Sequence, residues 1–303
     1  MKGWLCAAAV ALGVLPITVQ AQDQIVVASK IDTEGALLGN MILRVLEAHG
    51  MATQNKIQLG PTNIVRAAIL AGQIDIYPEY TGNGASFFHM ESDPAWRSWA
   101  KGAALVAKLD REKNRLIWLT PAPANNTWAI AVRRGLAQRR NLATMEDFAR
   151  YVRGGGAVVL AASVEFVDSP AALPAFEATY DFRLSDGQLL TLVGGNTSAT
   201  LRAAAEGMSG VNAAMAYGTD GAVAALGLVA LTDDKGAQIV YAPAPVVREA
   251  VLARHPEIAK ALDPVFATLT IDTLQRLNAA IAVDGKDAGA VATDYLRAKH
   301  FLR

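Results

Sequence analysis

Residues 74–84, Ile74-Asp75-Ile76-Tyr77-Pro78-Glu79-Tyr80-Thr81-Gly82-Asn83-Gly84, combine a short alternating strand with a proline and a turn framed by two glycines. Such a turn follows the carboxyl end of a strand, where open α/β sheets bind their ligands. Tyr80 and Asn83 are therefore candidate ligand contacts. An ordinary strand-to-helix connection, whose tyrosines cover an edge of the core, explains the same residues, because short motifs of this kind are weak evidence alone.

The segments before this stretch alternate between strand and helix patterns. Gln24–Ser29 is short, apolar and β-branched, and a helix with one apolar face follows it. Lys56–Leu59 begins a second pair of the same kind. This βαβαβ order predicts a parallel sheet flanked by helices. Lys30 and a helix N-terminus come at the end of the first strand and favour an anion there, although a solvated surface lysine is the alternative.

The pattern changes at residues 118–128, where two prolines force an extended crossing. Strand patterns then recur with helices between them, so we expect a second α/β lobe. Leu228–Leu231 and Gln238–Tyr241 are expected to bring the chain back to the first lobe, and helices complete the fold. The sequence thus predicts two lobes, two hinge crossings and one cleft, with a signal peptide at 1–21, first lobe at 22–125, second lobe at 126–235 and return at 236–303.

The N-terminus has the pattern of an export signal. Met1-Lys2 gives a positive start, Leu5–Val19 is almost uninterrupted apolar sequence, and Val19-Gln20-Ala21 resembles a small-x-small cleavage site. We therefore expect a soluble protein in the periplasm. Cys6, the only cysteine, lies inside the apolar run rather than at the cleavage point, which argues against a lipid anchor. The mature chain would then have no disulfide and no thiolate metal site.

Charge and motif content exclude several functions. The chain has 28 basic and 28 acidic residues, and this balance argues against nucleic acid as a partner, since phosphate binding needs a basic surplus. It contains no zinc-protease His-Glu-x-x-His, no Gly-x-Ser-x-Gly elbow and no phosphate-binding loop. The four histidines lack metal-ligand spacing. We expect no metal, no cofactor and no enzymatic activity.

Four aromatic residues share one position in the predicted topology, at a strand end beside Gly, Asn, Thr or Pro: Tyr80, Trp128, Tyr217 and Tyr241. Any one of them is more readily explained as a core residue. Four together are more informative, because strand ends converge on one crevice. Ring faces in a dry pocket suit a quaternary ammonium, which has no N–H to donate and is weakly hydrated.

Five spaced motifs extend this interpretation, and they occur in the order Ser29–Gly35, Asp75–Gly82, Thr120–Trp128, Ala216–Gly221 and Tyr241–Arg248. Together they resemble the substrate-binding proteins of osmoprotectant ABC transporters, in particular periplasmic glycine betaine-binding proteins of the stress-induced, low-affinity type. The resemblance covers essentially the whole mature chain. It implies a type II periplasmic-binding fold that closes on its ligand and delivers it to an ABC permease in the inner membrane. We expect a monomer.

The resemblance also implies roles for individual residues. The cation cage would comprise Tyr80, Tyr217 and Tyr241, with Trp128 where a tyrosine is usual. Asn126 stands where members with a tight cage often have aspartate, so one negative charge near the cation is missing.

For the ligand carboxylate, Lys30 matches the lysine implicated in holding it, and Asn83 falls where a threonine commonly helps. Thr127 is a further candidate polar contact. Ser169 replaces an arginine that clamps the carboxylate from the second lobe. Loss of such a charge-assisted contact costs roughly 1.5–3 kcal/mol, or about 10- to 150-fold in affinity, so we expect weak binding.

Two alternatives remain open at this point. The same fold could bind a different small ligand or signal to a membrane partner, and the serine at 169 is consistent with either. A bilobed exported enzyme is the other alternative, with Glu79, Glu165 and Asp220 as the candidate general bases near the cleft.

Overall fold

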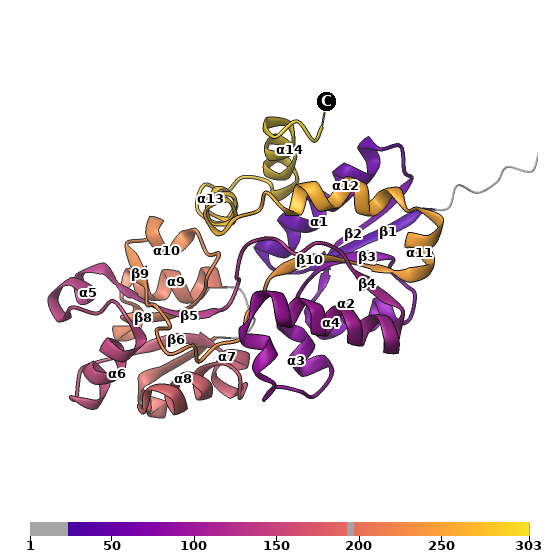
Figure 1. Ribbon diagram of the computed structural model, residues 1–303. Helices are drawn as coiled ribbons and strands as arrows, with labels where there is room; N and C mark the ends of the chain where they lie inside the picture. Colours follow the sequence, from indigo (N-terminus) through magenta and orange to yellow (C-terminus); the bar gives the residue numbers. More distant parts are fainter. Residues whose placement is uncertain (1–23, 193–196, 303) are drawn as a thin grey trace, which may run out of the picture.

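The computed structural model describes residues 24–192 and 197–302 (Figure 1). The expected signal peptide, Cys6 and the glycines at 194 and 195 lie outside these ranges. Within them the chain forms two five-stranded sheets, each covered by helices on both faces, which confirms the predicted two-lobed α/β class.

The first sheet has the order β2-β1-β3-β10-β4. Its members β1, β2 and β3 are parallel, as the βαβαβ pattern predicts, while β10 runs antiparallel to both of its neighbours. The strands are β1 (Ile25–Lys30), β2 (Thr53–Gly60), β3 (Ile76–Tyr80), β4 (Leu116–Trp118) and β10 (Pro243–Arg248).

The second sheet repeats this plan with the order β7-β6-β8-β5-β9. Here β5 is the reversed strand, and β6 lies parallel to β7 and β8. In both sheets the reversed strand is the first one after a crossing between lobes. The strands are β5 (Trp128–Arg133), β6 (Leu160–Ser163), β7 (Leu189–Leu192), β8 (Ala213–Tyr217) and β9 (Leu228–Ala230).

Helices cover both sheets. In the first lobe they are α1 (Thr33–Ala48), α2 (Thr62–Leu70), α3 (Asn83–Phe87), α4 (Trp99–Asn114), α11 (Glu249–Arg254), α12 (Glu257–Phe266), α13 (Ile271–Ala282) and α14 (Ala288–Ala298). In the second lobe they are α5 (Arg134–Arg140), α6 (Met145–Arg153), α7 (Val164–Asp168), α8 (Leu173–Tyr180), α9 (Thr197–Glu206) and α10 (Ala222–Ala225). Short 3₁₀ turns occur at Pro94–Arg97, Asp186–Gln188 and Met208–Gly210.

Alternation along the strands explains why each sheet has two buried faces. In β5, Ile130 and Val132 pack in one core with the aromatic residues of α6, α7 and α8. Ala131 lies between them and belongs to the opposite core, with residues of α9. Successive strand residues point to opposite faces, and helices cover both faces of the sheet. Residues on both faces are therefore apolar.

The return of the chain to the first lobe differs from the expected one. Leu228–Ala230 forms β9 of the second sheet, and Gln238–Tyr241 is not a strand. The returning strand is β10, which begins at Pro243. Pro245 lies directly opposite Pro78 of β3. Opposed residues in an antiparallel pair need not hydrogen bond to each other, so the sheet tolerates two prolines, which lack the N–H, at this position. For the same reason the opening stretch continues as a strand to Tyr80 instead of turning after Pro78.

The two crossings lie side by side and are hydrogen bonded to each other. Ala122 N donates to Pro243 O at 2.8 Å, and Asn126 N donates to Tyr241 O at 2.9 Å. Thr81, next to the end of β3, donates its backbone N–H to Ala242 O at 3.0 Å. The stretch at 74–84 therefore anchors the connection between the lobes.

None of the helices in the described ranges has the length and apolar character to cross a membrane.

A buried ion pair joins helices α2 and α4 of the first lobe. The Arg66 guanidinium on α2 forms a two-point ion pair with Asp110 on α4, and both side chains are buried. Trp118 Nε1 of β4 donates to the same carboxylate at 2.7 Å, and Asn114 Nδ2 donates at 2.8 Å. One carboxylate thus connects two helices and an edge strand.

Replacing Asp110 by alanine should lower the free energy of unfolding by about 3–5 kcal/mol, because it leaves a buried guanidinium without a counter-charge. Arg44→Ala, which removes an exposed pair with Glu47, should cost less than about 1 kcal/mol. Urea unfolding followed by circular dichroism measures both. Equal effects of the two substitutions would contradict this account.

Candidate ligand-binding site

Three of the four predicted aromatic residues form one cluster. Trp128, the first residue of β5, lies directly opposite Tyr217, the last residue of β8. Their ring centroids are 4.7 Å apart with an interplanar angle of 34°, and Phe166 also packs on Trp128, at 5.4 Å. Tyr241 packs against the same core from the second crossing. Its ring lies on Gly82, where a Cβ would come within 2.7 Å of it.

Tyr80 lies next to this cluster with its ring face already in contact with a cation. The Lys30 ammonium is 4.6 Å from the ring centroid. The Tyr80 hydroxyl donates to Glu34 Oε1 at 2.9 Å. Asn126 also hydrogen bonds to Tyr80, and the Asn126 Oδ1 accepts from Thr219 Oγ1 at 2.8 Å. Asn126 therefore connects Tyr80 to the second lobe.

The Glu79 carboxylate holds both residues that were predicted to bind a ligand carboxylate. Lys30 forms a buried ion pair with it, and Asn83 Nδ2 donates to Oε1 at 2.7 Å. The backbone N–H of Tyr80 donates to Oε1 at 2.7 Å, and the Tyr77 hydroxyl donates to Oε2 at 3.1 Å. Glu79 is fully buried and Lys30 is 6% exposed. In this conformation the charge of Lys30 is neutralised within the protein.

A small cavity of about 30 Å³ lies between α1, α13 and the 217–222 turn of the second lobe. It is on the scale of a water molecule. Three carboxylate side chains and no lysine or arginine contribute to its lining, which consists of Asp32, Thr33, Glu34, Asn126, Thr197, Ser198, Tyr217, Thr219, Asp220, Gly221, Ala222, Asn278 and Ala282. The electrostatic character of this site is negative.

Two of these carboxylates have unusual proton affinities. Burial raises the pKa of Glu34 to about 7, although hydrogen bonds from Thr219, Asn278 and Tyr80 oppose the shift. Burial likewise raises the pKa of Asp220 to about 6, against a hydrogen bond from the Tyr217 backbone. Burial disfavours the charged form of each carboxylate, and the attraction of a bound cation would stabilise that form.

Helix α13 joins the two lobes at this cavity. Asn278 Nδ2 donates to Glu34 Oε2 at 2.7 Å and to Thr219 O at 3.1 Å. Gln275 Nε2 donates to Gly218 O at 2.8 Å. At Gly221 a Cβ would lie only 1.8 Å from Gln275 O, so the turn approaches the helix as closely as a glycine allows.

The remaining two predicted contacts have other partners. The Thr127 hydroxyl donates to Ile239 O at 2.8 Å and so holds the two crossings together. Ser169 follows α7, and its Oγ accepts from Ala171 N at 3.4 Å. Within the described residues, no hydrogen bond or ring contact joins Ser169 to Tyr80, Trp128, Tyr217 or Tyr241.

Sequence reasoning missed Glu34 and Asn278 as site residues, and it considered Asp220 only as a base for an enzyme. Glu34 lies in the first turn of α1, where a carboxylate is explained by the helix dipole alone. Asn278 is 244 positions from its partner Glu34, in a helix with no motif around it. The residues around Asn278 in the sequence therefore gave no indication that it belongs to the site. Across residues 24–192 and 197–302, no group of three His, Cys, Asp or Glu residues could hold a metal ion.

Comparison with known proteins places this geometry in a family. Residues 23–298 match the family described as the substrate binding domain of ABC-type glycine betaine transport systems. The chain is 58% identical over 294 residues to the glycine betaine-binding protein YehZ of Escherichia coli (strain K12), covering 97% of this chain and 96% of that protein. It is 30% identical to a glycine-betaine-binding protein of Pseudomonas aeruginosa, covering 91% and 88%.

The fold agrees with the sequence match. A solved structure of apo YehZ from Escherichia coli superposes with a TM-score of 0.75 at 59% identity, covering 92% of this chain and 99% of that one. Both sequence and structure matches extend across the two lobes and the C-terminal helices. The chain belongs to the family of substrate-binding domains of ABC-type glycine betaine transport systems.

Proposed function

We propose that this protein binds a quaternary-ammonium solute such as glycine betaine between its lobes and delivers it to an ABC permease in the inner membrane. Family membership makes it a solute-binding component of transport and not an enzyme. Glu79, one of the candidate bases, is committed to four donors, which also argues against a catalytic role.

The contacting rings of Trp128 and Tyr217 beside the negative cavity carry the proposal. Ring faces attract a cation through their quadrupole, and the attraction grows when the site is dry. The carboxylates of Glu34 and Asp220 add charges of the favourable sign. They supply the negative charge that Asn126 lacks relative to family members with aspartate.

The ligand carboxylate is assigned to Lys30 and Asn83, with Thr127 and Ser169 as further polar contacts. Because Lys30 is paired with Glu79, it must share its charge between two carboxylates. Ser169 provides no charge from the second lobe. Both features predict low affinity for a zwitterion. They also predict that cations without a carboxylate, such as choline, bind with comparable affinity.

The cavity of about 30 Å³ has no room for a quaternary ammonium in this conformation. Binding therefore requires the lobes to part at the contacts between α13 and the 217–222 turn. Hinge motion of this kind takes place in a few connecting residues, and the paired crossings are the connecting residues here.

We further propose that residues 1–21 direct export, that the mature protein is a soluble monomer in the periplasm and that it does not bind nucleic acid. The lobes are assigned to 22–125 with 236–303, and to 126–235. The second sheet, whose strands lie between Trp128 and Ala230, supports this division.

Isothermal titration with glycine betaine, proline betaine, choline and carnitine tests the ligand class. Binding of at least one of them at micromolar to millimolar concentration is expected. If none binds at millimolar concentration, the proposed ligand class is wrong, although the fold and family stand.

Trp128→Ala should weaken the binding of any such ligand about 30-fold, because a desolvated cation–π contact contributes about 2 kcal/mol. Trp128→Phe, the matched control, keeps a ring and should retain affinity within a few-fold. Thermal unfolding of both variants checks that the second lobe remains folded. Unchanged affinity in Trp128→Ala would show that the cation lies elsewhere.

Affinity should rise between pH 6 and pH 8, because Glu34 with a pKa of about 7 is mostly neutral at the lower pH and mostly charged at the higher. A cation that lowers this pKa by one unit binds about tenfold more tightly to the charged form. Choline and glycine betaine titrations across this range measure the effect. Glu34→Gln should remove most of the rise and leave at most about a twofold change from Asp220, whose pKa is about 6. An undiminished rise in this variant would exclude Glu34 as its source.

A further inference from the structure

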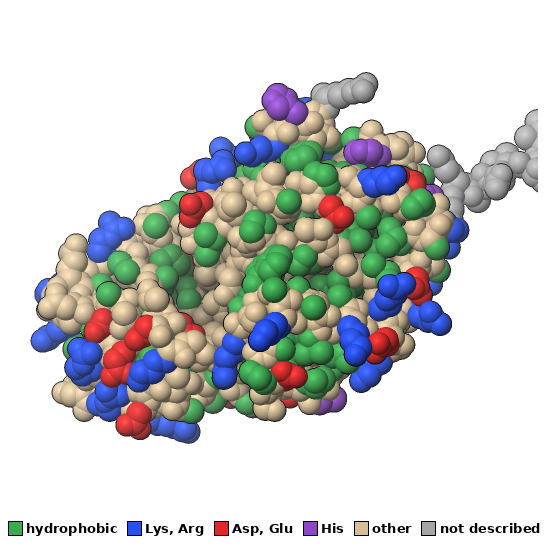
Figure 2. All heavy atoms as spheres, in the orientation of Figure 1, with side chains coloured by type: hydrophobic (Ala, Val, Ile, Leu, Met, Phe, Trp, Pro, Cys, Tyr) green, Lys and Arg blue, Asp and Glu red, His purple; other side chains and the backbone are tan. Residues whose placement is uncertain are grey.

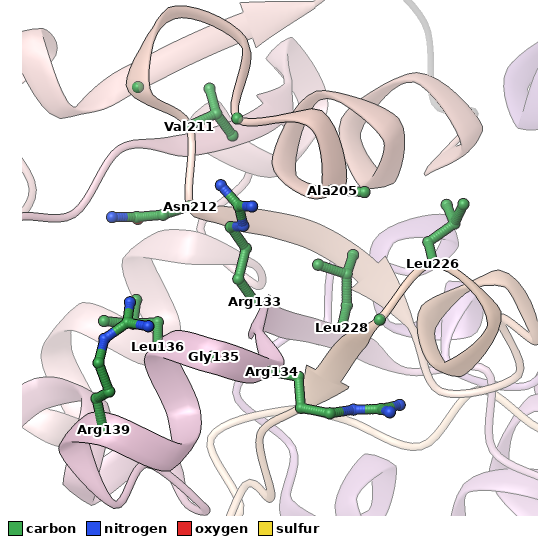
Figure 3. A pocket seen from close by; sticks show the side chains of 13 residues that line it. Arg133, Arg134, Gly135, Leu136, Arg139, Ala205, Val211, Asn212, Leu226 and Leu228 are labelled. Atoms are coloured by element: carbon green, nitrogen blue, oxygen red, sulfur yellow. The ribbon is translucent and has the colours of Figure 1, made fainter.

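A second and larger cavity, of about 520 Å³, lies at the opposite end of the second sheet from the aromatic cluster (Figure 3). Strand β5 leads from one site to the other, with Trp128 at its first residue and Arg133 at its last, so the strand separates them by about 17 Å. The lining comprises Arg133, Arg134, Gly135, Leu136, Arg139, Ala205, Gly207, Gly210, Val211, Asn212, Leu226, Gly227 and Leu228.

This arginine pocket contains positive charge without a counter-charge. Arg133, Arg134 and Arg139 line it, and no aspartate or glutamate does. In the described part of the chain, none of the three forms an ion pair. Arg134 makes a single long hydrogen bond to Ala224 O, at 3.4 Å. The pocket lining therefore has three guanidinium groups available to a ligand.

Glycines let two of these guanidinium groups lie close to the backbone. At Gly207, which has a φ of +71°, a Cβ would come within 2.8 Å of Arg133 Nη1. At Gly135 a Cβ would come within 3.2 Å of Arg139 Nη1. In Figure 3 both side chains extend in the direction of the turn that carries Val211. The two guanidinium groups thus come from different elements toward one hollow.

The rest of the chain does not share this charge. The whole chain has 28 basic and 28 acidic residues, and on the face drawn in Figure 2 the two signs are interspersed over both lobes. The charges of Arg133 and Arg139 in one hollow, with Arg134 at its rim, concentrate the local potential, which raises the local concentration of anions. The planar guanidinium fork matches the geometry of phosphate and carboxylate oxygens.

We propose that the arginine pocket is an anion site that takes a phosphate-bearing ligand. Arg133 and Arg139 bind the oxygens of the ligand, and Arg134 adds charge at the rim. The ligand is either a free phosphorylated solute or the headgroup of an anionic phospholipid, since both present the same oxygens. This site is separate from the cleft, so ligand binding there does not require the lobes to move relative to each other.

Titration of the full chain with inorganic pyrophosphate at low ionic strength tests the site. The unmodified protein should bind pyrophosphate, and Arg133→Gln and Arg139→Gln should each weaken binding by about tenfold or more. Arg202→Gln is the matched control, because Arg202 is an exposed arginine of the same lobe that does not line the pocket. It should change affinity less than twofold. All three positions are exposed, and unchanged thermal unfolding confirms that each variant is folded.

Sedimentation with vesicles distinguishes the two sources of the ligand. Co-sedimentation with phosphatidylglycerol vesicles but not phosphatidylcholine vesicles, lost in Arg133→Gln and displaced by pyrophosphate, identifies a lipid headgroup. Pyrophosphate binding without co-sedimentation identifies a free solute. The proposal is overturned if neither probe binds, or if Arg202→Gln weakens binding as much as the pocket variants do.

Discussion

The buried carboxylate of Glu79 is the interaction on which the binding region depends. It accepts from Lys30, Asn83, the Tyr80 backbone and the Tyr77 hydroxyl, and so fixes the end of β3 relative to β1 and α3. A buried carboxylate without such donors would be costly. The four donors hold Tyr80 in place, and Thr81 beside it binds the second crossing. One carboxylate thereby links the first sheet to the connection between the lobes.

The same arrangement determines the electrostatics of the cleft. Lys30 is neutralised by Glu79, whereas Glu34 and Asp220 have no basic partner in the lining of the cavity beside them. The cleft therefore favours cations, with rings from Trp128 and Tyr217 on one side. Under the proposed assignment of the site, recognition of the ammonium end contributes more to binding than recognition of a carboxylate.

Much of the fold was predictable, because its signals are local. The parallel strands β1 to β3 follow from the period and residue type of the segments that form them. The family and its function followed from five spaced motifs. The return through β10 was not predicted, since the paired prolines 78 and 245 are tolerated only through their register. Glu34, Asn278 and the Lys30–Glu79 pair were missed because their partners lie 46 to 244 positions away.

A crystal structure with glycine betaine bound tests the central claim most directly. The trimethylammonium group should lie within about 6 Å of the ring centroids of Trp128 and Tyr217, on the side of Glu34 and Asp220. Lys30 should remain in contact with Glu79 while it reaches the ligand carboxylate. A ligand carboxylate placed against Glu34 and Asp220, with the ammonium remote from both rings, would contradict the account.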